Sequence, residues 1–390
     1  MLNTSTHDDN FEMVAKTFRG LEELLAGEIE AIGGRNIRKS TRVVFFSGDK
    51  EILYRANFQL RTALRILKPF FDFRAKNEDE LYKGAYSFDW SILLSENMTF
   101  AIDGVLNSPY FNHSKYIALK VKDAIADQFR ARKGIRPSVD TDNPDIRINL
   151  HISGDKCTLL LDSSGESLHK RGYRSRASPA PLNEILAAGM IMLSGWDRKS
   201  PFIDPMCGSG TIPIEAAMMA HNIPPGIYRK QFAFEKWPDF DDKLFGKIFN
   251  EDYPEPVLSP SISGSDISPQ VIAMARRNAK NAFLNKKIDF TISSFEEMLP
   301  SGEGGIVLFN PPYGERLKKD NIKAFHTLIG DILKKNYTGY TAWILSSNLE
   351  ALKYTGLRTE NKIVLYNGPL ECRLVKYSIY KGSKKDMAKK

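Results

Sequence analysis

Residues 202–211 have the sequence Phe-Ile-Asp-Pro-Met-Cys-Gly-Ser-Gly-Thr, and they join a short apolar strand to a helix expected over 211–221. Glycine lets the backbone of a turn approach a ligand closely, and the helix N-terminus behind it favours negative charge. A dinucleotide fingerprint would need a third glycine and no Asp-Pro at the strand end. Taken alone, the Gly-Ser-Gly turn therefore predicts either a nucleotide-binding loop or a tight structural turn.

A second motif, Asn310-Pro311-Pro312-Tyr313, follows an apolar run over 305–309 that predicts a buried strand. Two consecutive prolines remove two N–H donors and fix φ, so nearby carbonyl oxygens are left free to accept hydrogen bonds. The Asn310 amide oxygen is a further acceptor, and the flat Tyr313 ring can stack on a planar group. This combination predicts a site for chemistry on the amino group of a nucleobase or a similar molecule.

The C-terminal half alternates predicted strands with helices, which is typical of an α/β, doubly wound, Rossmann-like sheet. The expected strands are 201–204, 261–266, 288–292, 305–309 and 341–346, with an antiparallel edge hairpin of 363–366 and 373–380. Ligands in such sheets bind beyond the carboxyl ends of the strands. Asp204, Asp266, Ser294 and Asn310 all fall at or just beyond strand ends, so we expect them to gather at one site.

In this order, the two motifs resemble those of class I S-adenosylmethionine-dependent methyltransferases that methylate exocyclic amines. The resemblance implies that Asp204 and the Gly208–Gly210 backbone hold the methionyl part of the cofactor and that Asp266 accepts from its ribose hydroxyls. Asp266 could instead cap the helix that begins at Ser268-Pro269. The remaining cofactor-binding residues expected on this basis are Met206, Cys207, Gly208, Gly210, Thr211, Ile267, Ser294, Phe295 and Asn310.

Ser294 stands where methyltransferases of this class often carry an acid for the adenine amine, and it could still bond to adenine while Phe295 stacks on the ring. Cys207 could be a catalytic thiol, but no His or acid pairs with it in the sequence, so we expect a packing residue. The expected catalytic residues are Asn310, Pro311, Pro312 and Tyr313: the Asn310 amide and Pro311 carbonyl accept the amine hydrogens, and Tyr313 stacks on an extruded base.

The N-terminal half alternates short strands and helices, and a βαββαβ-like domain is expected first. The next unit contains a helix with Ile117, Val121, Ile125 and Phe129 on one face, followed by strands over 146–152 and 157–161. This part resembles a ferredoxin-like domain followed by a THUMP domain, as found in RNA-modifying enzymes. Candidate RNA-binding residues are Lys115 on the helix and Arg130, Arg132, Lys133 and Arg136 in the loop after it. A solvated basic edge is the alternative.

A basic linker then leads into the catalytic domain, and its Lys170, Arg171, Arg174 and Arg176 either contact RNA or serve as a polar hinge. The expected organisation is a disordered tail over 1–10, a ferredoxin-like domain over 11–70, a THUMP domain over 71–166, the linker over 167–180, a methyltransferase domain over 181–381 and a basic tail over 382–390. The aromatic insertion over 224–260 is expected to be a lid or a satellite cluster packed on the sheet.

Stretches 168–174, 181–184, 204–211, 232–237 and 310–317 are together similar to the bacterial THUMP-containing 23S rRNA guanine-N2-methyltransferases, including the methyltransferase domain of RlmL-type enzymes. The resemblance implies S-adenosyl-L-methionine as cofactor, a structured RNA substrate (23S rRNA or a large-subunit precursor) and rRNA methylation as the activity. Because the sequence holds one catalytic domain, no second fused activity is expected. The alternatives are a tRNA guanine-N2-methyltransferase, a DNA or RNA adenine-N6 methyltransferase, and a non-enzymatic RNA-binding assembly factor.

Composition is consistent with these expectations. The 390 residues carry 55 Lys and Arg against 47 Asp and Glu, a net charge of +8, which suits a polyanionic partner but is also ordinary for a solvated surface. Cys157, Cys207 and Cys372 lack disulfide or metal spacing, which predicts a reducing compartment and no metal requirement. Neither a signal peptide nor a membrane-spanning apolar run is recognisable, so a cytoplasmic location is expected.

Overall fold

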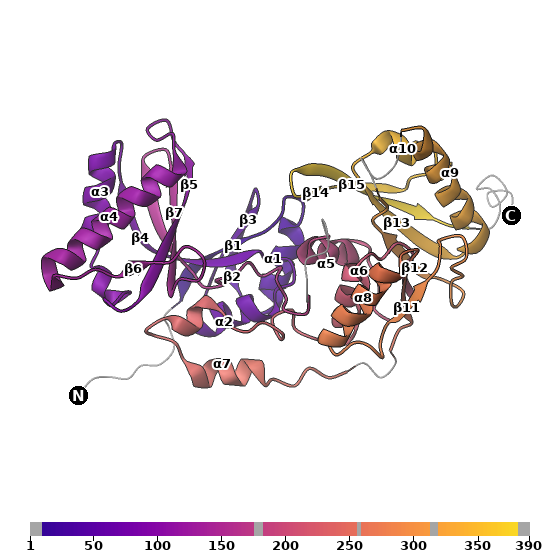
Figure 1. The fold of residues 1–390 in the computed structure, drawn as a ribbon, viewed down its shortest axis with the longest axis horizontal. Helices are drawn as coiled ribbons and strands as arrows, with labels where there is room; N and C mark the ends of the chain where they lie inside the picture. Colours follow the sequence, from indigo (N-terminus) through magenta and orange to yellow (C-terminus); the bar gives the residue numbers. More distant parts are fainter. Residues whose placement is uncertain (1–9, 175–181, 256–258, 313–318, 381–390) are drawn as a thin grey trace. The chain divides into compact units, whose positions relative to one another are not determined.

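The computed structural model describes residues 10–174, 182–255, 259–312 and 319–380 (Figure 1). The predictions for Tyr313, Arg176, Pro181, residues 314–317 and the two tails therefore lie outside the described residues. The chain divides into two compact units, each discontinuous in sequence. The N-terminal unit contains residues 1–17, 25–168 and 229–251, and the C-terminal unit contains residues 18–24, 169–228 and 252–390.

The chain begins with the predicted βαββαβ arrangement. Its elements are β1 (Phe11–Lys16), α1 (Glu22–Ala31), β2 (Arg35–Ser40), β3 (Val43–Gly48), α2 (Lys50–Gln59) and β4 (Arg65–Arg74). Helix α2 begins after Asp49, whose side chain accepts from the Ile52 N–H at 3.0 Å. Strand β2 is an exposed edge strand with one partly buried apolar residue, Ile37. A strand of this kind shows little hydrophobic alternation.

The THUMP-like region continues the same sheet. Its elements are α3 (Glu78–Ser87), η1 (Trp90–Ile92), β5 (Thr99–Asn107), α4 (Ser114–Lys133), β6 (Ser138–Val139), β7 (Ile146–Ser153) and β8 (Lys156–Asp162). The strand order is β2-β3-β1-β4-β8-β7-β5-β6. The ten-residue strand β4 pairs with β1 at one end and with β8 along most of its length. One continuous eight-stranded sheet therefore runs through both predicted N-terminal domains.

One local prediction in this region is wrong. Arg130, Arg132 and Lys133 lie in the last turn of α4 rather than in a loop, and Arg136 alone of the four follows the helix. The helix ends at Gly134, which has φ +73° and donates its N–H to the Arg130 carbonyl at 3.0 Å. The sequence holds no helix breaker before that glycine, so the helix continues past its last large apolar residue, Phe129.

The aromatic insertion also differs from the prediction. Residues 229–251 belong to the N-terminal unit, where they form η2 (Ala233–Lys236) and α7 (Asp242–Phe249). Phe234 stacks on Tyr54 of α2 with ring centroids 4.4 Å apart, and Phe245 meets Phe234 edge-on at 5.1 Å. Tyr228 of the insertion belongs to the C-terminal unit, where its ring centroid lies 6.1 Å from that of Phe283, whereas residues 229–251 form a satellite aromatic cluster that packs on α2. The spacing of its aromatic residues could not identify that partner.

The C-terminal unit confirms the predicted doubly wound sheet. Its elements are α5 (Glu184–Leu193), β9 (Phe202–Asp204), α6 (Thr211–Ala220), β10 (Ile262–Asp266), α8 (Pro269–Asn281), β11 (Asp289–Ile292), β12 (Gly305–Phe309), α9 (Lys319–Asn336), β13 (Tyr340–Ser346), α10 (Leu349–Lys353), β14 (Asn361–Asn367) and β15 (Leu370–Ser378). The strand order is β11-β10-β9-β12-β13-β15-β14. The first five strands are parallel, and β15 runs antiparallel to both of its neighbours.

The position of the ligand site follows from this topology. The chain moves from β9 outward to β11 and then returns to β12 on the other side of β9, so the direction of winding reverses between β9 and β12. Ligands in open α/β sheets bind beyond the carboxyl ends of the strands at such a switch point. The strands beside it are firmly packed, since Val307, Leu308 and Phe309 of β12 are fully buried.

None of the described helices is both long and apolar enough to cross a membrane.

Candidate active site

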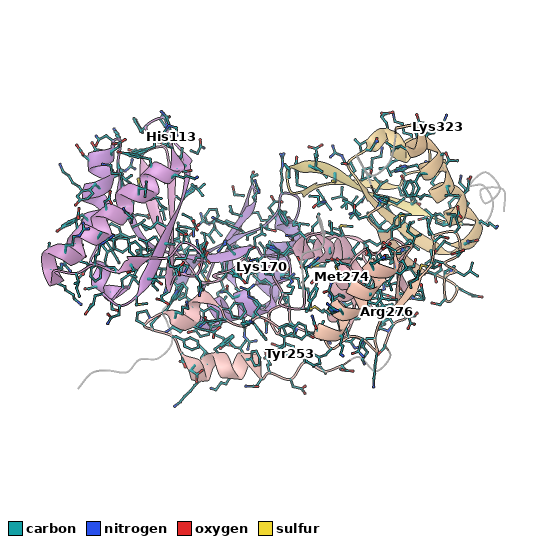
Figure 2. The ribbon with its side chains drawn as sticks, viewed as in Figure 1. His113, Lys170, Tyr253, Met274, Arg276 and Lys323 are labelled. Atoms are coloured by element: carbon teal, nitrogen blue, oxygen red, sulfur yellow. The ribbon has the colours of Figure 1, made fainter. Side chains whose placement is uncertain are left out.

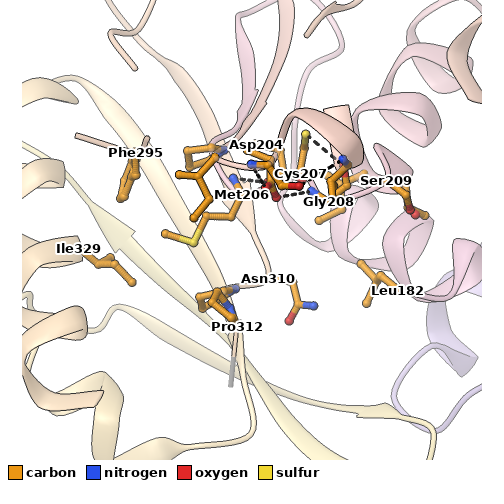
Figure 3. Close-up of a pocket in the computed structure, with 18 of the residues that line it drawn as sticks. Leu182, Asp204, Met206, Cys207, Gly208, Ser209, Phe295, Asn310, Pro312 and Ile329 are labelled. Carbon is orange, nitrogen blue, oxygen red and sulfur yellow. Dashed lines mark hydrogen bonds between the residues drawn. The ribbon is translucent and has the colours of Figure 1, made fainter. Parts of the chain in front are cut away.

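A cavity of about 1190 Å³ lies in the C-terminal unit, at the carboxyl ends of β9, β10 and β12. Figure 3 shows Phe295 and Ile329 on one side of it and Leu182 and Ser209 on the other, with Asn310 between them. The predicted residues that line it are Asp204, Met206, Cys207, Gly208, Thr211, Asp266, Ile267, Ser294, Phe295, Asn310, Pro311 and Pro312. Residues separated by more than a hundred positions in sequence therefore meet in one space.

Of the predicted cofactor-binding residues that the structure describes, Gly210 does not line the cavity. Its φ of +83° requires glycine, and a Cβ there would lie 3.0 Å from both the Ala275 side chain and the Phe290 ring. Its N–H donates to the Cys207 carbonyl at 2.9 Å, which closes the turn. Gly210 therefore lets the turn pack against α8 and β11, while Gly208, with φ +54°, faces the cavity.

Asp204 ends strand β9 and is 1% exposed. Its Oδ1 accepts from the Met206 N–H at 3.1 Å, which fixes the carboxyl group at the start of the turn. Burial raises the pKa of Asp204 well above its ordinary value; the Met206 bond opposes this shift, and the charge of Asp266 adds to it. A buried carboxyl group that lines a cavity is suited to a cationic ligand, because a positive charge would favour its ionised form.

Asp266 ends strand β10 and joins two segments of the site. Its Oδ1 accepts from the Ser268 N–H at 3.0 Å, and its Oδ2 accepts from the Gly208 N–H at 3.3 Å. The side chain that caps helix α8 belongs to Ser268, whose Oγ accepts from the Val271 N–H at 3.4 Å. Each carboxylate oxygen has a second lone pair, so Asp266 can still accept hydroxyl hydrogens from a ligand in the cavity.

Asn310 carries an unused acceptor. Its Oδ1 is buried and has no hydrogen-bond partner among the residues that the structure describes. Buried polar atoms are rarely left without a partner, and an exception within a cavity wall points to a group supplied from outside. Pro311 and Pro312 follow directly and line the same cavity. The site therefore offers the acceptors predicted for a planar amine, next to the two carboxyl groups of β9 and β10.

Cys207 is not placed for nucleophilic chemistry. The residue is 7% exposed, and burial raises the pKa of its thiol well above the ordinary value, with Asp204 and Asp266 adding to the shift. A thiol that stays protonated is a poor nucleophile. The side chain instead packs against Gly264 of β10, where an added Cβ would come within 3.1 Å of the Cys207 sulfur. The structure thus favours the packing role expected from the sequence.

Several lining residues have no obvious sequence signal. Glu296 lines the cavity two positions after Ser294, so an acid is present near the predicted adenine position although not at the position where it was sought. Ser347 and the turn between β14 and β15 form another part of the wall, as do apolar residues of α9 such as Phe325 and Ile329. Apolar and small polar residues of this kind form no motif that would separate them from ordinary core or turn residues, whereas Glu296 could have been found by allowing the spacing to vary.

The candidate RNA-binding residues fall into two groups. Lys115, Arg130, Arg132, Lys133 and Arg136 of the N-terminal unit are all exposed. Three of them form exposed ion pairs, Arg130 with Asp127, Arg132 with Asp89 and Lys133 with Glu96. Exposed pairs of this kind contribute little to stability. Lys170 of the C-terminal unit, which is labelled in Figure 2, is also exposed.

Arg171 and Arg174 point inward in the C-terminal unit. Arg171 is 2% exposed, and its Nε donates to Glu215 Oε1 at 3.4 Å. Arg174 donates to Glu184 Oε1 at 2.8 Å, and its side chain is 16% exposed. Each side chain is thus directed to a carboxylate of its own unit. Basic residues in a segment between domains look alike in sequence whether they face solvent or carboxylates.

Among the described residues no cluster of His, Cys, Asp or Glu side chains could hold a metal ion.

Three family models match the chain. An RMKL-like methyltransferase domain matches residues 171–376, a THUMP domain matches residues 75–162, and an RlmL ferredoxin-like domain matches residues 12–67. A Synechocystis protein named "Putative RNA methyltransferase slr0064" is 38% identical over 369 residues, which are 94% of this chain and 96% of that protein.

Two crystal structures are similar over almost the whole chain. One is SMU.472, "a putative methyltransferase complexed with SAH", with a TM-score of 0.86 and 29% identity over 97% of this chain and all of that one. The other is "a predicted N6-adenine-specific DNA methylase" from Listeria monocytogenes, with a TM-score of 0.82 and 29% identity over 95% of this chain and 97% of that one. Both likenesses span the N-terminal and C-terminal units alike.

Proposed function

The chain belongs to the RMKL-like methyltransferase family, and from that premise we propose that it transfers a methyl group from S-adenosylmethionine to the exocyclic N2 of a guanine in 23S rRNA. The THUMP domain and the name of the Synechocystis relative support RNA as the substrate class. The name of the Listeria structure supports the competing adenine-N6 activity on DNA, which the experiment below includes.

The residues of the cavity fit S-adenosylmethionine, which supplies an electrophilic methyl group on a sulfonium. Asp204, a buried carboxyl at the cavity wall, would hold the ammonium of the methionyl part. Asp266 would accept from the ribose hydroxyls, and a carboxylate forms such bonds strongly. Ile267 and Phe295 would enclose the adenine ring, with Ser294 or Glu296 as acceptors for its amino group. The structure of SMU.472 contains S-adenosylhomocysteine, the demethylated form of this cofactor.

The observation that carries the proposed reaction is the buried Oδ1 of Asn310, for which the described residues supply no hydrogen-bond partner. The lone pair of a guanine amino group is delocalised into the ring, so the nitrogen is a weak nucleophile. Accepting its two hydrogens at Asn310 Oδ1 and the Pro311 carbonyl makes the nitrogen more tetrahedral and directs its lone pair. Positioning and fixed dipoles then supply most of the rate, and no strong base is required.

RNA capture is assigned to the exposed basic residues of the N-terminal unit: Lys115, Arg130, Arg132, Lys133 and Arg136. Lysine and arginine side chains bind phosphates largely independently of sequence, and the affinity falls steeply with salt. This group would therefore hold structured RNA while the methyltransferase cavity selects the base. Lys170 of the C-terminal unit is a further candidate contact.

The test is transfer of labelled methyl from S-adenosylmethionine to separated 23S rRNA, 16S rRNA, tRNA and genomic DNA from a strain that lacks the gene. Wild type and Asn310→Ala are compared, and the modified nucleoside is identified by mass spectrometry. The proposal predicts N2-methylguanosine in 23S rRNA and its loss with Asn310→Ala. The same nucleoside in tRNA would overturn the substrate, and N6-methyladenine in any nucleic acid would overturn the base. No transfer to any of the four would favour a ribosomal particle or an RNA-binding factor.

A further inference from the structure

The segment 169–174 of the C-terminal unit is anchored behind the glycine-rich turn. Arg171 and Tyr173 are 2% and 1% exposed. Arg171 Nε and the Tyr173 hydroxyl both donate to Glu215 Oε1, at 3.4 and 3.3 Å. Glu215 lies in α6, the helix that begins directly after the glycine-rich turn. Two buried donors therefore fix this short segment to the helix that carries the turn.

Two further contacts leave the segment little freedom. Gly172 has φ +106°, and a Cβ at this position would lie 2.1 Å from the Tyr228 carbonyl oxygen. The backbones of the two residues approach so closely that no larger side chain fits. On the other side, Asn281 at the end of α8 donates its Nδ2 to the Tyr173 carbonyl at 2.9 Å. The backbone that carries Arg174 is thus held by both helices that flank the cofactor strands.

Arg174 contacts the cavity wall from behind. Its Nη2 donates to Thr211 Oγ1 at 2.9 Å, and its Nη1 donates to Ser209 Oγ at 3.3 Å. Its Nε donates to Glu184 Oε1 at 2.8 Å, and Nη2 reaches the Leu182 carbonyl at 3.3 Å. Ser209, Thr211 and Leu182 line the cavity, whereas Arg174 itself is absent from the lining. One planar guanidinium therefore joins the glycine-rich turn, the start of α6 and the start of α5.

We propose that Arg174 is a positioning residue for the cofactor-binding turn. It fixes Ser209 and Thr211, and with them the turn whose Gly208 N–H is bonded to Asp266. It also neutralises Glu184, which is 5% exposed. The inference rests on the proposed function, because it assumes that the turn holds S-adenosylmethionine. It replaces the expectation that Arg174 contacts RNA.

The test compares wild type, Arg174→Ala and Arg174→Lys, with Lys286→Ala as a control that removes an exposed charge from the same unit. Affinity for S-adenosylhomocysteine is measured by calorimetry and affinity for 23S rRNA by filter binding. We expect Arg174→Ala to weaken cofactor binding at least about tenfold, with RNA affinity unchanged within about twofold. Arg174→Lys should recover only part of the loss, because an ammonium with three donors cannot replace the planar guanidinium at all four acceptors. Lys286→Ala should change neither affinity.

Kinetics separate a positioning role from general destabilisation. In Arg174→Ala the KM for S-adenosylmethionine should rise while kcat at saturating cofactor stays within about threefold of wild type. The double variant Arg174→Ala, Glu184→Gln removes the unpaired carboxylate, and cofactor affinity should stay low because Ser209 and Thr211 remain unsupported. Full recovery in the double variant would overturn the proposal.

Three other outcomes are also decisive. Unchanged cofactor affinity in Arg174→Ala, or weaker RNA binding with normal cofactor binding, would overturn the positioning role and leave the proposed function intact. If wild type itself failed to bind S-adenosylhomocysteine, the proposed function would fail first. If Arg174→Ala did not fold, the paired variant Ser209→Ala, Thr211→Ala removes the other half of the same contacts. Its cofactor affinity should fall by a similar factor, and unchanged affinity would again overturn the role.

Discussion

Asp266→Asn should weaken binding of S-adenosylhomocysteine far more than the change of one atom would suggest. In the wild type, Oδ1 accepts from the Ser268 N–H at 3.0 Å and Oδ2 accepts from the Gly208 N–H at 3.3 Å. An amide offers one oxygen and one NH2 group, so one of these two N–H donors must face another donor. The variant therefore disturbs the glycine-rich turn or the start of α8 and also removes the negative charge assigned to the ribose hydroxyls.

The magnitude follows from these contacts. A backbone donor left without its acceptor costs about 1–3 kcal/mol, and this cost counts against binding because the apo-variant can relax the turn, which the ligand must then restore. A hydroxyl that bonds to a neutral amide rather than to a carboxylate loses about half of a charge-assisted bond, on the order of 1 kcal/mol. The sum, about 2–4 kcal/mol, corresponds to a loss of affinity of roughly 30-fold to 700-fold. Calorimetric titration of the apo-protein with S-adenosylhomocysteine measures this change directly.

Ser268→Ala is the matched control, because it removes the capping hydroxyl that accepts from the Val271 N–H but keeps the Ser268 N–H that Asp266 binds. It should lower the free energy of unfolding by about 1 kcal/mol and leave the cofactor affinity within about threefold. If Asp266→Asn bound S-adenosylhomocysteine as tightly as this control, the ribose assignment would be refuted.

Two further predictions concern burial. Because burial raises the pKa of Asp204, its contribution to stability is present at low pH and is lost as the pH rises from the unfolded-state pKa toward the raised folded-state pKa. Between pH 5 and 8 the melting temperature of the apo wild type should therefore fall relative to that of Asp204→Asn, while wild-type affinity for S-adenosylhomocysteine rises. A parallel pH dependence of the two melting temperatures would contradict this. Phe234→Ala should lower the free energy of unfolding of the N-terminal unit, measured in urea, by about 3–5 kcal/mol, because Phe234 is fully buried against Tyr54. Phe249→Ala, at a residue that is 41% exposed, should lower it by about 1 kcal/mol or less, and equal losses would argue against a cluster centred on Phe234.

The sequence predicted the catalytic half of the molecule well, because its signals are local. Each parallel strand is a short apolar run that ends at a polar residue, and the rule that ligands gather beyond strand ends placed Asp204, Asp266 and Asn310 together without any knowledge of contacts. The cavity lining confirms that these residues share one space. The two motifs lie more than a hundred positions apart, so this convergence depends on topology and not on sequence proximity.

The predictions that failed depend on long-range partners. The basic character of Arg171 and Arg174 was visible, but the buried Glu215 and Glu184 that accept their hydrogen bonds were not. The aromatic residues near Phe234 predicted a cluster, yet nothing in their spacing indicated Tyr54, which lies 180 positions earlier in the chain and belongs to the other end of the sequence. The charge or hydrophobicity of a residue indicates that it forms an ion pair or an apolar contact, whereas the identity of its partner depends on the fold.

The central claim is that Asn310 acts on the amine and not mainly on the cofactor. The most direct measurement is the single-turnover rate of methyl transfer to 23S rRNA by wild type and Asn310→Ala at saturating S-adenosylmethionine, beside the affinity of each protein for S-adenosylhomocysteine. Loss of a preorganised hydrogen-bonding group in the transition state should slow transfer by about 100-fold or more, with cofactor affinity changed by less than about fivefold. A transfer rate within about threefold of wild type, or a loss explained entirely by weaker cofactor binding, would contradict the account.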